Sequence, residues 1–308
     1  MDSKFLCDLS KSRFIKNDEL NNHHFNDYTQ NVFGNKMCEK HFAMFDSGSG
    51  KELYTKARAV HSSSMLAYNF FHWISSENTF RYENVVYNDV FFEVKIPTIS
   101  KSPAPANIDV VLVSEDTSTW LMFESKFTEH FHPSSYRMMN LSNGYFDLDR
   151  YLFESRVDAK RIVQLVWEWY EKAKKDDKKY YDGVKQLLCH LIAILNLTNP
   201  SSRNEIWGKV QKKNSGLEEL PQKVLFRTIL FSPNSVYNEH HTASEEYKNL
   251  CKEFYASVKN AYPDLDVAVI TYSEMWREMA RQIQDRCLIA YLTDRYLRCA
   301  DITTTSCE

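Results

Sequence analysis

Apolar residues recur along the chain with two different periods, and the first of these patterns predicts a helix followed by three strands. Between residues 51 and 75, apolar side chains are spaced alternately three and four positions apart, which is typical of one amphipathic helix. Runs rich in Val, Phe and Ile, separated by polar loop residues, predict strands at 85–96, 108–114 and 119–127.

The pattern changes after residue 128. Residues 128–155 are rich in aromatic side chains but have no regular period, so we expect irregular structure there. Neighbouring strands followed by alternating helices and strands indicate an α/β fold, with a mixed central sheet flanked by helices. The alternating part comprises helices at about 155–174, 182–196 and 244–261, strands at 224–231 and 266–272, and a final helix that ends near 298.

The first fifty residues differ from the rest. They are polar, rich in Asn, His and Phe, and end in the loop-like stretch DSGSG. We therefore predict that residues 1–50 form an N-terminal arm or small subdomain. Residues 51–308 would form the main domain, with a helical segment inserted around 128–180.

Composition limits the compartment and the partners. The 308 residues are 43% hydrophobic and carry a formal net charge of −3, so any surface that attracts nucleic acid must be local. Seven cysteines without close pairs suggest reduced thiols, and the N-terminus lacks the apolar stretch of a signal peptide. The longest apolar run, at 187–195, is far shorter than a membrane span. These features predict a cytoplasmic protein that does not bind membranes.

The stretch NIDVVLVSEDTSTWLMFESKF, residues 107–127, places three charged residues within apolar strands. A charge that faces a core costs several kcal/mol unless it is paired or holds a metal. If the turn is centred between Asp116 and Thr117, Asp109 lies opposite Glu124, with Cβ atoms about 4.5–5.5 Å apart. Two such carboxylates suit Mg²⁺. Lys126 would project from the same face as Glu124, where it would orient or help deprotonate a water that attacks a phosphate.

An acid on one strand followed by E-x-K on the next resembles the core motif of the PD-(D/E)xK nuclease superfamily. The matching residues are Asp109, Glu124, Ser125 and Lys126, and Ile108 stands where the motif has its Pro. Within the superfamily, the chain is similar to a branch of restriction endonucleases with F-E, I-D and E-S-K-F on successive strands. The resemblance implies a restriction-endonuclease-like fold over residues 51–232 and metal-dependent cleavage of phosphodiester bonds, usually in DNA.

The resemblance also implies roles for individual residues. Asp109, Glu124 and the main-chain carbonyl of Ser125 would hold Mg²⁺, for which Mn²⁺ would substitute, and Lys126 would prepare the water. The alternative is that Lys126 is only a structural partner of Glu124 or Asp109. Glu93, on the preceding strand, is either a further acid of the site or a solvent-facing charge on an edge strand.

Three other residues are weaker candidates. Nuclease relatives often place a Gln near the active site on the helix that Gln186 occupies here. Helical spacing puts Gln186 and His190 one turn apart facing a cleft, with His190 as a local hydrogen-bonding residue. Some relatives add a metal-binding His from their first helix, but a partly buried helix histidine is the favoured interpretation of His61.

We therefore predict a metal-dependent endonuclease of restriction or anti-phage type, acting on double-stranded DNA. A structure-specific repair or RNA-cutting nuclease, and an inactive nucleic-acid-binding module of the same fold, are the alternatives. Double-strand cutting would favour a homodimer. Basic and aromatic residues after the E-S-K strand would contact nucleic acid, unless the tryptophans pack the helix and the basic residues form a solvated surface: Arg150, Arg156, Lys160, Arg161, Trp167 and Trp169.

Overall fold

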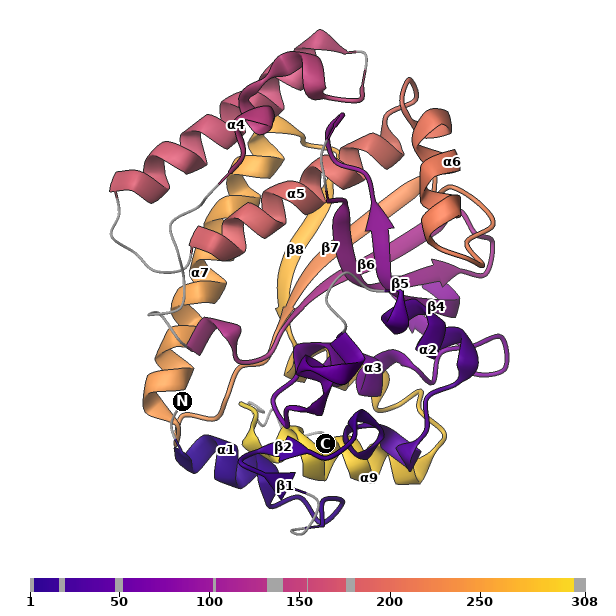
Figure 1. The fold of residues 1–308 in the computed structure, drawn as a ribbon, viewed down its shortest axis with the longest axis vertical. Coiled ribbons are helices and arrows are strands. Elements are labelled where there is room, and N and C mark those ends of the chain that lie inside the picture. The colour runs from indigo at the N-terminus through magenta and orange to yellow at the C-terminus, as the bar shows by residue number, and fades with distance from the viewer. Residues whose placement is uncertain are drawn as a thin grey trace.

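A six-stranded sheet forms the centre of the molecule (Figure 1). The computed structural model describes residues 3–16, 20–47, 52–101, 104–131, 141–153, 155–175 and 181–301. Strands β3 to β6 are antiparallel neighbours, whereas β7 and β8 continue the sheet in parallel, which confirms the predicted mixed sheet. In sheet order, the strands are β3 (Phe80–Tyr82), β4 (Val85–Ile96), β5 (Ala106–Ser114), β6 (Thr119–Lys126), β7 (Lys223–Leu230) and β8 (Asp266–Thr271).

Helices cover both faces of this sheet, because both faces are apolar. The parallel strands also need long crossover connections, which here contain helices. Side chains alternate along β6, so Met122 packs into one core and Leu121 into the other. The first core is closed by α4 (Arg156–Lys175), α5 (Tyr181–Thr198), α6 (Arg203–Lys213) and α7 (Asn238–Ala261). The second is closed by α1 (Ser3–Ser10), α2 (Glu39–Asp46), α3 (Ser63–Phe71), α8 (Tyr272–Met279) and α9 (Arg286–Arg295).

The strands follow the predicted pattern closely, and most of the later helices do so as well. The predicted strand at 85–96 is β4 with the same bounds, and the helices predicted at 155–174 and 182–196 are α4 and α5. The helix predicted at 244–261 begins earlier, at Asn238, and the last predicted helix is two helices, α8 and α9. Helix α6 was not predicted. Between residues 128 and 155, the described part contains only short turns, as expected.

The helix predicted over 51–75 is wrong. Residues 52–58 form two short turns, Glu52–Tyr54 and Lys56–Arg58, and α3 begins only at Ser63. Ser62 has an extended backbone (φ −67°, ψ 121°), and its hydroxyl accepts a hydrogen bond from the Met65 N–H at 3.3 Å. A serine that caps a helix in this way starts a new helix rather than continuing an old one. The apolar residues before Ser62, such as Leu53 and Ala57, are buried from short turns and not from a continuous helix.

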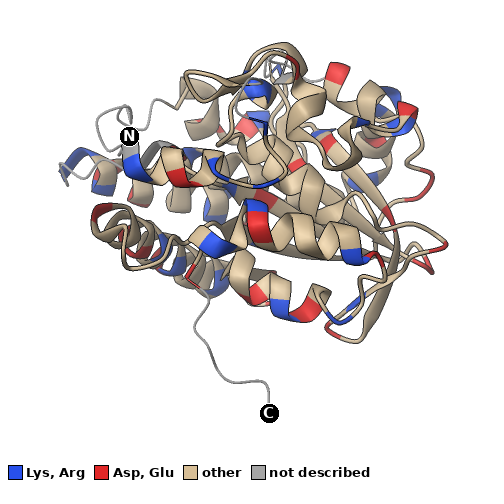
Figure 2. Cartoon of the chain, turned by 90° about the horizontal axis from the view of Figure 1, so that it is seen from below, with Lys and Arg blue, Asp and Glu red and all other residues tan. Residues whose placement is uncertain are grey.

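Charges are mixed over the surface, in keeping with the small net charge. Seen from below in Figure 2, blue and red segments are interspersed along the helices. Within the described residues, no helix combines the length and the apolar character that a membrane span requires.

The N-terminal residues contribute to the second core, where Phe5 and Phe45 are fully buried. Arg295 on α9 is also fully buried and joins distant parts of the chain. Its guanidinium donates to the carbonyls of Leu9 and Val60 at 2.9 and 3.0 Å. The division of the chain at residue 50 stays a prediction.

Candidate active site

The alternation of side chains along β4 and β5 reverses at Glu93 and Asp109. Phe92 packs into the second core and Val94 into the first, although residues two apart on a strand normally share a face. On β5, Val110 and Ile108 show the same reversal. Glu93 has φ 55°, a left-handed conformation that is uncommon for residues other than glycine. The two carboxylates therefore lie where both strands are locally irregular, as is common near functional sites.

The β5–β6 hairpin has the predicted register. Val113 pairs with Trp120, and the midpoint between them lies between Asp116 and Thr117, as expected. Within this loop, the main-chain N–H of Thr117 donates to the Ser114 carbonyl at 2.8 Å. Val110 pairs with Phe123, and the next residues along the two strands are Asp109 and Glu124.

Asp109 contacts the neighbouring strand through its carboxylate. One Asp109 oxygen, Oδ2, accepts a hydrogen bond from the Ser125 N–H at 2.6 Å. The Ser125 side chain points to the other face, where its Oγ lies 2.8 Å from the Tyr272 hydroxyl. Ser125 therefore reaches the candidate site only through its main chain.

Lys126 lies on the face of β6 that also carries Glu124. Its Nζ is 2.5 Å from Glu124 Oε1 and donates to Gln186 Oε1 at 2.8 Å. Glu124 has no exposed surface, and Lys126 is 9% exposed. Both the catalytic and the structural interpretation of Lys126 include this ion pair, so the pair itself does not decide between them.

Negative charge is in excess at this point. Glu124 is buried, Asp109 is half-buried and Glu129 is exposed, and all three carboxylates act on the one ammonium group of Lys126. Loss of water around Asp109 raises its pKa well above the ordinary range, and Glu124 and Glu93 raise it further. Lys126 and the Ser125 N–H offset only part of this shift.

The same carboxylates keep Lys126 charged. Burial alone would lower the pKa of Lys126, but the charges of Glu124, Glu129 and Asp109 raise it above its ordinary value. Lys126 therefore keeps its proton at neutral pH and acts as a hydrogen-bond donor.

Helix α5 brings Gln186 and His190 to the carboxylates. His190 Nδ1 lies 3.4 Å from Glu124 Oε2, and burial lowers the pKa of His190, so the ring is neutral. Gly183 allows the first turn of α5 to lie close to α7. Any larger residue at this position would collide with the phenol ring of Tyr247. Gln186 and His190 line the same pocket, of about 310 Å³. The helical spacing of the two residues predicts that they face one cleft.

Glu129 was missed in the sequence. It lies just after β6 and is exposed, and its carboxylate accepts hydrogen bonds from the N–H groups of Phe127 and Thr128 at 2.8 and 3.0 Å. Although packing around the group opposes ionisation, Lys126 and the Ser63 hydroxyl hold the pKa of Glu129 below its ordinary value. The only sequence signal is an acid three residues after Lys126, which is common in any chain.

The carboxylates meet part of the requirement for a metal ion. Asp109 and Glu124 supply hard oxygen donors of the kind that Mg²⁺ prefers, and Glu124 Oε2 is buried without a hydrogen-bond partner. However, among the described residues, no three His, Cys, Asp or Glu side chains are arranged as a ready metal site. His61 lies before α3 and packs against His24, with ring centroids 6.1 Å apart.

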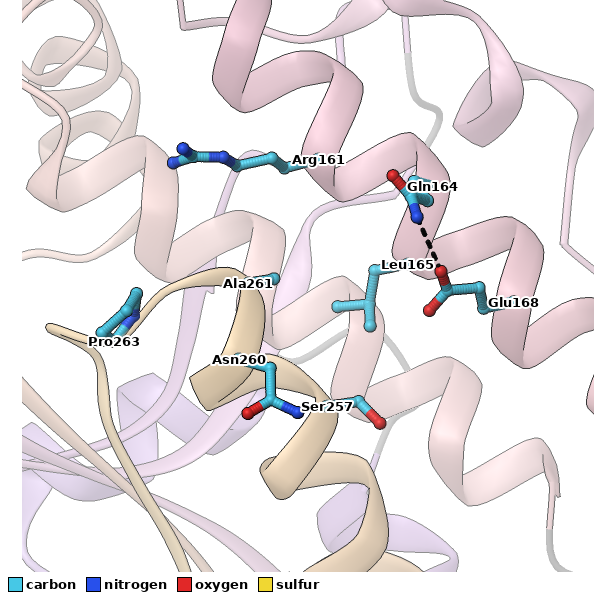
Figure 3. A pocket seen from close by; sticks show the side chains of 8 residues that line it. All are labelled: Arg161, Gln164, Leu165, Glu168, Ser257, Asn260, Ala261 and Pro263. Carbon is cyan, nitrogen blue, oxygen red and sulfur yellow. Dashed lines mark hydrogen bonds between the residues drawn. The ribbon is translucent and has the colours of Figure 1, made fainter.

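A second pocket, of about 420 Å³, lies between α4 and the end of α7 (Figure 3). Leu165 lines it together with polar side chains, and Gln164 donates to Glu168 at 2.8 Å. None of the predicted catalytic residues lines this pocket, since those residues lie on β4, β5, β6 and α5.

The predicted basic surface is largely neutralised. Arg150, Arg156 and Arg161 lie 3.5, 2.6 and 3.6 Å from the carboxylates of neighbouring aspartates. Trp169 is buried, whereas Trp167 is 45% exposed. The packing interpretation therefore holds for Trp169 and, in part, for Trp167, whose ring centroid lies 4.4 Å from that of Phe146.

The family of the chain follows from a match that covers most of its length. Residues 8–297 match the model of a family described as "Restriction Endonuclease associating with ARP". The chain belongs to this family. Membership confirms the predicted resemblance to restriction endonucleases; it supports a nuclease in general and implies a nucleic acid substrate. No curated protein and no solved structure matches the chain.

The charges at the end of β6 are of a kind that phosphodiester hydrolysis can use. Phosphodiester hydrolysis develops negative charge on the attacked phosphate and on the leaving oxygen. A protonated lysine held in a fixed position can stabilise such charge, and neighbouring carboxylates can hold a cation that does the same.

Proposed function

We propose that the chain is a Mg²⁺-dependent deoxyribonuclease of restriction or anti-phage type that hydrolyses phosphodiester bonds in double-stranded DNA. The observation that carries the proposal is the convergence of Asp109, Glu124 and Lys126 at one end of the hairpin, with more negative than positive charge. A structural cluster would gain stability from balanced charges, whereas this one retains a deficit that a cation would fill.

Asp109, Glu124 and the Ser125 carbonyl would hold the ion, with Mn²⁺ able to replace Mg²⁺. When bound, the ion would supply Lewis-acid stabilisation of the phosphate and the leaving oxygen. Half-buried Asp109 offers a route from solvent, while Glu124 lies deeper. Glu93 would add negative charge from the neighbouring strand.

Lys126 would act as a donor. Because the surrounding carboxylates raise its pKa, it would hold its proton, orient the attacking water and offset charge on the phosphate. Gln186 would position Lys126 through the 2.8 Å hydrogen bond to its Nζ. We therefore expect Lys126 to orient the water and to offset negative charge, and not to take a proton from the water.

The test is cleavage by the purified protein of plasmid DNA, single-stranded DNA and RNA, in Mg²⁺, Mn²⁺ or EDTA. We expect plasmid cleavage with either ion and none in EDTA. Undiminished cleavage in chelator would refute metal dependence, and cleavage of RNA alone would refute the proposed substrate. Glu124→Gln, which keeps the shape and removes the charge, is the matched inactive variant. Sedimentation of the protein with and without duplex DNA would test the proposed homodimer.

A further inference from the structure

The pocket beside the candidate active site is built from two parts of the chain. Residues 105–107 at the start of β5 form one wall, and four residues of α5 form the other. On the helix, Lys185 and Cys189 are one turn apart, as are Gln186 and His190, so the four side chains form one continuous patch. Gln186 contacts Lys126, and His190 faces Glu124, which places the pocket directly next to the catalytic candidates.

Lys185 gives the pocket an available positive charge. It is half-buried and has neither a hydrogen-bond nor an ion-pair partner within the described ranges. This distinguishes it from Arg150, Arg156 and Arg161, each of which has an aspartate nearby. An unpaired lysine next to a phosphodiesterase site is suited to contact a phosphate that neighbours the scissile one.

Asn107 gives the pocket an acceptor. Its side-chain nitrogen donates to the Glu93 carboxylate, which fixes the amide orientation. Its Oδ1 is consequently left as an acceptor, and it is shielded from water without a hydrogen-bond partner. A phosphate cannot satisfy this oxygen, because a phosphate diester has no N–H group. The N–H edge of a nucleobase can.

We infer that this pocket binds one nucleotide of the substrate, adjacent to the scissile phosphate, with its phosphate on Lys185 and a base N–H on Asn107 Oδ1. The pocket, of about 310 Å³, has room for one nucleotide. Because Asn107 Oδ1 is shielded from water, a base must leave the duplex stack to bring an N–H group to it. The nucleotide would therefore be unpaired, so the enzyme would favour DNA in which the base next to the cut is mismatched or easily extruded. This inference rests on the proposed function and names its substrate more closely.

The first experiment measures binding without metal, so that cleavage plays no part. The ligands are dAMP, N6,N6-dimethyl-dAMP, which lacks the exocyclic N–H groups, and inorganic phosphate, each titrated by NMR in EDTA. We expect dAMP to bind, the dimethylated nucleotide to bind about fivefold more weakly, and phosphate to bind more weakly still. Equal affinity for dAMP and for either comparison ligand would overturn the assignment of the base.

The second experiment uses Lys185→Met, with Lys209→Met as its control. Lys209 is an exposed lysine on α6 that pairs with Glu205 at 2.6 Å. Lys185→Met should weaken dAMP binding about tenfold, raise KM for DNA and leave kcat within about twofold, whereas Lys209→Met should change none of these. Equal binding and KM in the two variants would overturn the role of Lys185.

The third experiment compares plasmid-derived duplexes with and without a mismatch next to the cut. Faster cleavage of the mismatched duplex by the wild type, and loss of this preference in Lys185→Met, would support an unpaired nucleotide. Equal rates on both duplexes would overturn it. These outcomes are separable from failure of the proposed function, which would appear as full cleavage by Glu124→Gln or in EDTA.

Discussion

Two clusters of buried charge lie on the same sheet, and they differ in their balance. On β7, Arg227 is almost fully buried and contacts Glu83 at 2.9 Å and Asp266 at 2.8 Å. Lys223 also lies 3.9 Å from Asp266, so two cations face two carboxylates. Glu83 and Asp266 are 43% and 36% exposed, so both acids keep contact with water.

The cluster at the end of β6 is not balanced in this way, and one of its acids has no contact with water. Asp109, Glu124 and Glu129 act on the single ammonium group of Lys126, and Glu124 has no exposed surface at all. A balanced cluster with hydrated acids can persist for structural reasons alone, because its charges are compensated. A deficit of positive charge at a water-poor position is costly, and it is more readily understood as a site that receives a cation or a developing charge.

The sharpest test of this difference is to remove the ammonium group. Lys126→Met should lower kcat about 10²- to 10³-fold, since it deletes a preorganised donor, while DNA affinity changes little because other residues contact the phosphates. Gel shifts and cleavage rates, with circular dichroism to verify folding, measure both effects. Parallel loss of binding and cleavage would make Lys126 a scaffold residue like Arg227.

The converse substitution belongs to the other cluster. Arg227→Met should lower the free energy of unfolding by about 3 kcal/mol, at the low end for a broken buried pair because the two acids reach solvent. Urea denaturation measures this change. Turnover per folded molecule should stay at the wild-type level, and a selective loss of turnover would remove the contrast between the clusters.

Metal should stabilise only the unbalanced cluster. Mg²⁺ at 100 times its Kd should stabilise the wild type by about 2.7 kcal/mol, as measured by thermal melts with and without the ion. Asp109→Asn should be at least as stable as the wild type in EDTA, since its oxygen can still accept from the Ser125 N–H, and should respond much less to Mg²⁺. A destabilised Asn variant in a protein indifferent to metal would mean that Asp109 is a salt-bridge partner only.

The smallest expected effect is a pH dependence. Since the folded-state pKa of Asp109 is raised, folding is favoured by its protonated form below the ordinary pKa of 3.8, and this advantage is lost as pH rises through the raised value. In EDTA, the stability of the wild type relative to Asp109→Asn should therefore fall with pH, by at most about 1.4 kcal/mol per pH unit. Denaturation at a series of pH values tests the sign, and a rise with pH would contradict it.

The sequence predicts some parts of this molecule better than others for physical reasons. The strands are encoded locally, by runs such as those of β4 and β5 whose side chains suit a buried sheet. The position of the turn fixes the register of the hairpin. This register predicts that Asp109 lies near Glu124 and Lys126. The helix over 51–75 failed because the Ser62 cap outweighs the apolar period, and α6 was missed because only Ile206 and Val210 on it are buried.

Residues whose positions depend on tertiary structure could not be found in this way. Asn107 meets Glu93 only because β4 and β5 reverse their alternation there. Glu129 folds back onto the N–H groups at the end of its own strand, and no period marks it. Lys185 reads as an ordinary helix lysine until its lack of a partner is visible in three dimensions.

The buried guanidinium of Arg295 affects when the N-terminal part of this protein can fold during synthesis. It binds the Leu9 carbonyl across 286 positions of sequence and the Val60 carbonyl across 235. Contacts of such long range form late in folding, and translation proceeds from the N-terminus. The segment that leads into α3, and so positions Ser63 beside Glu129, thus lacks its anchor until Arg295 has left the ribosome. We expect nascent chains to be unable to complete this side of the site until Arg295 has emerged from the ribosome.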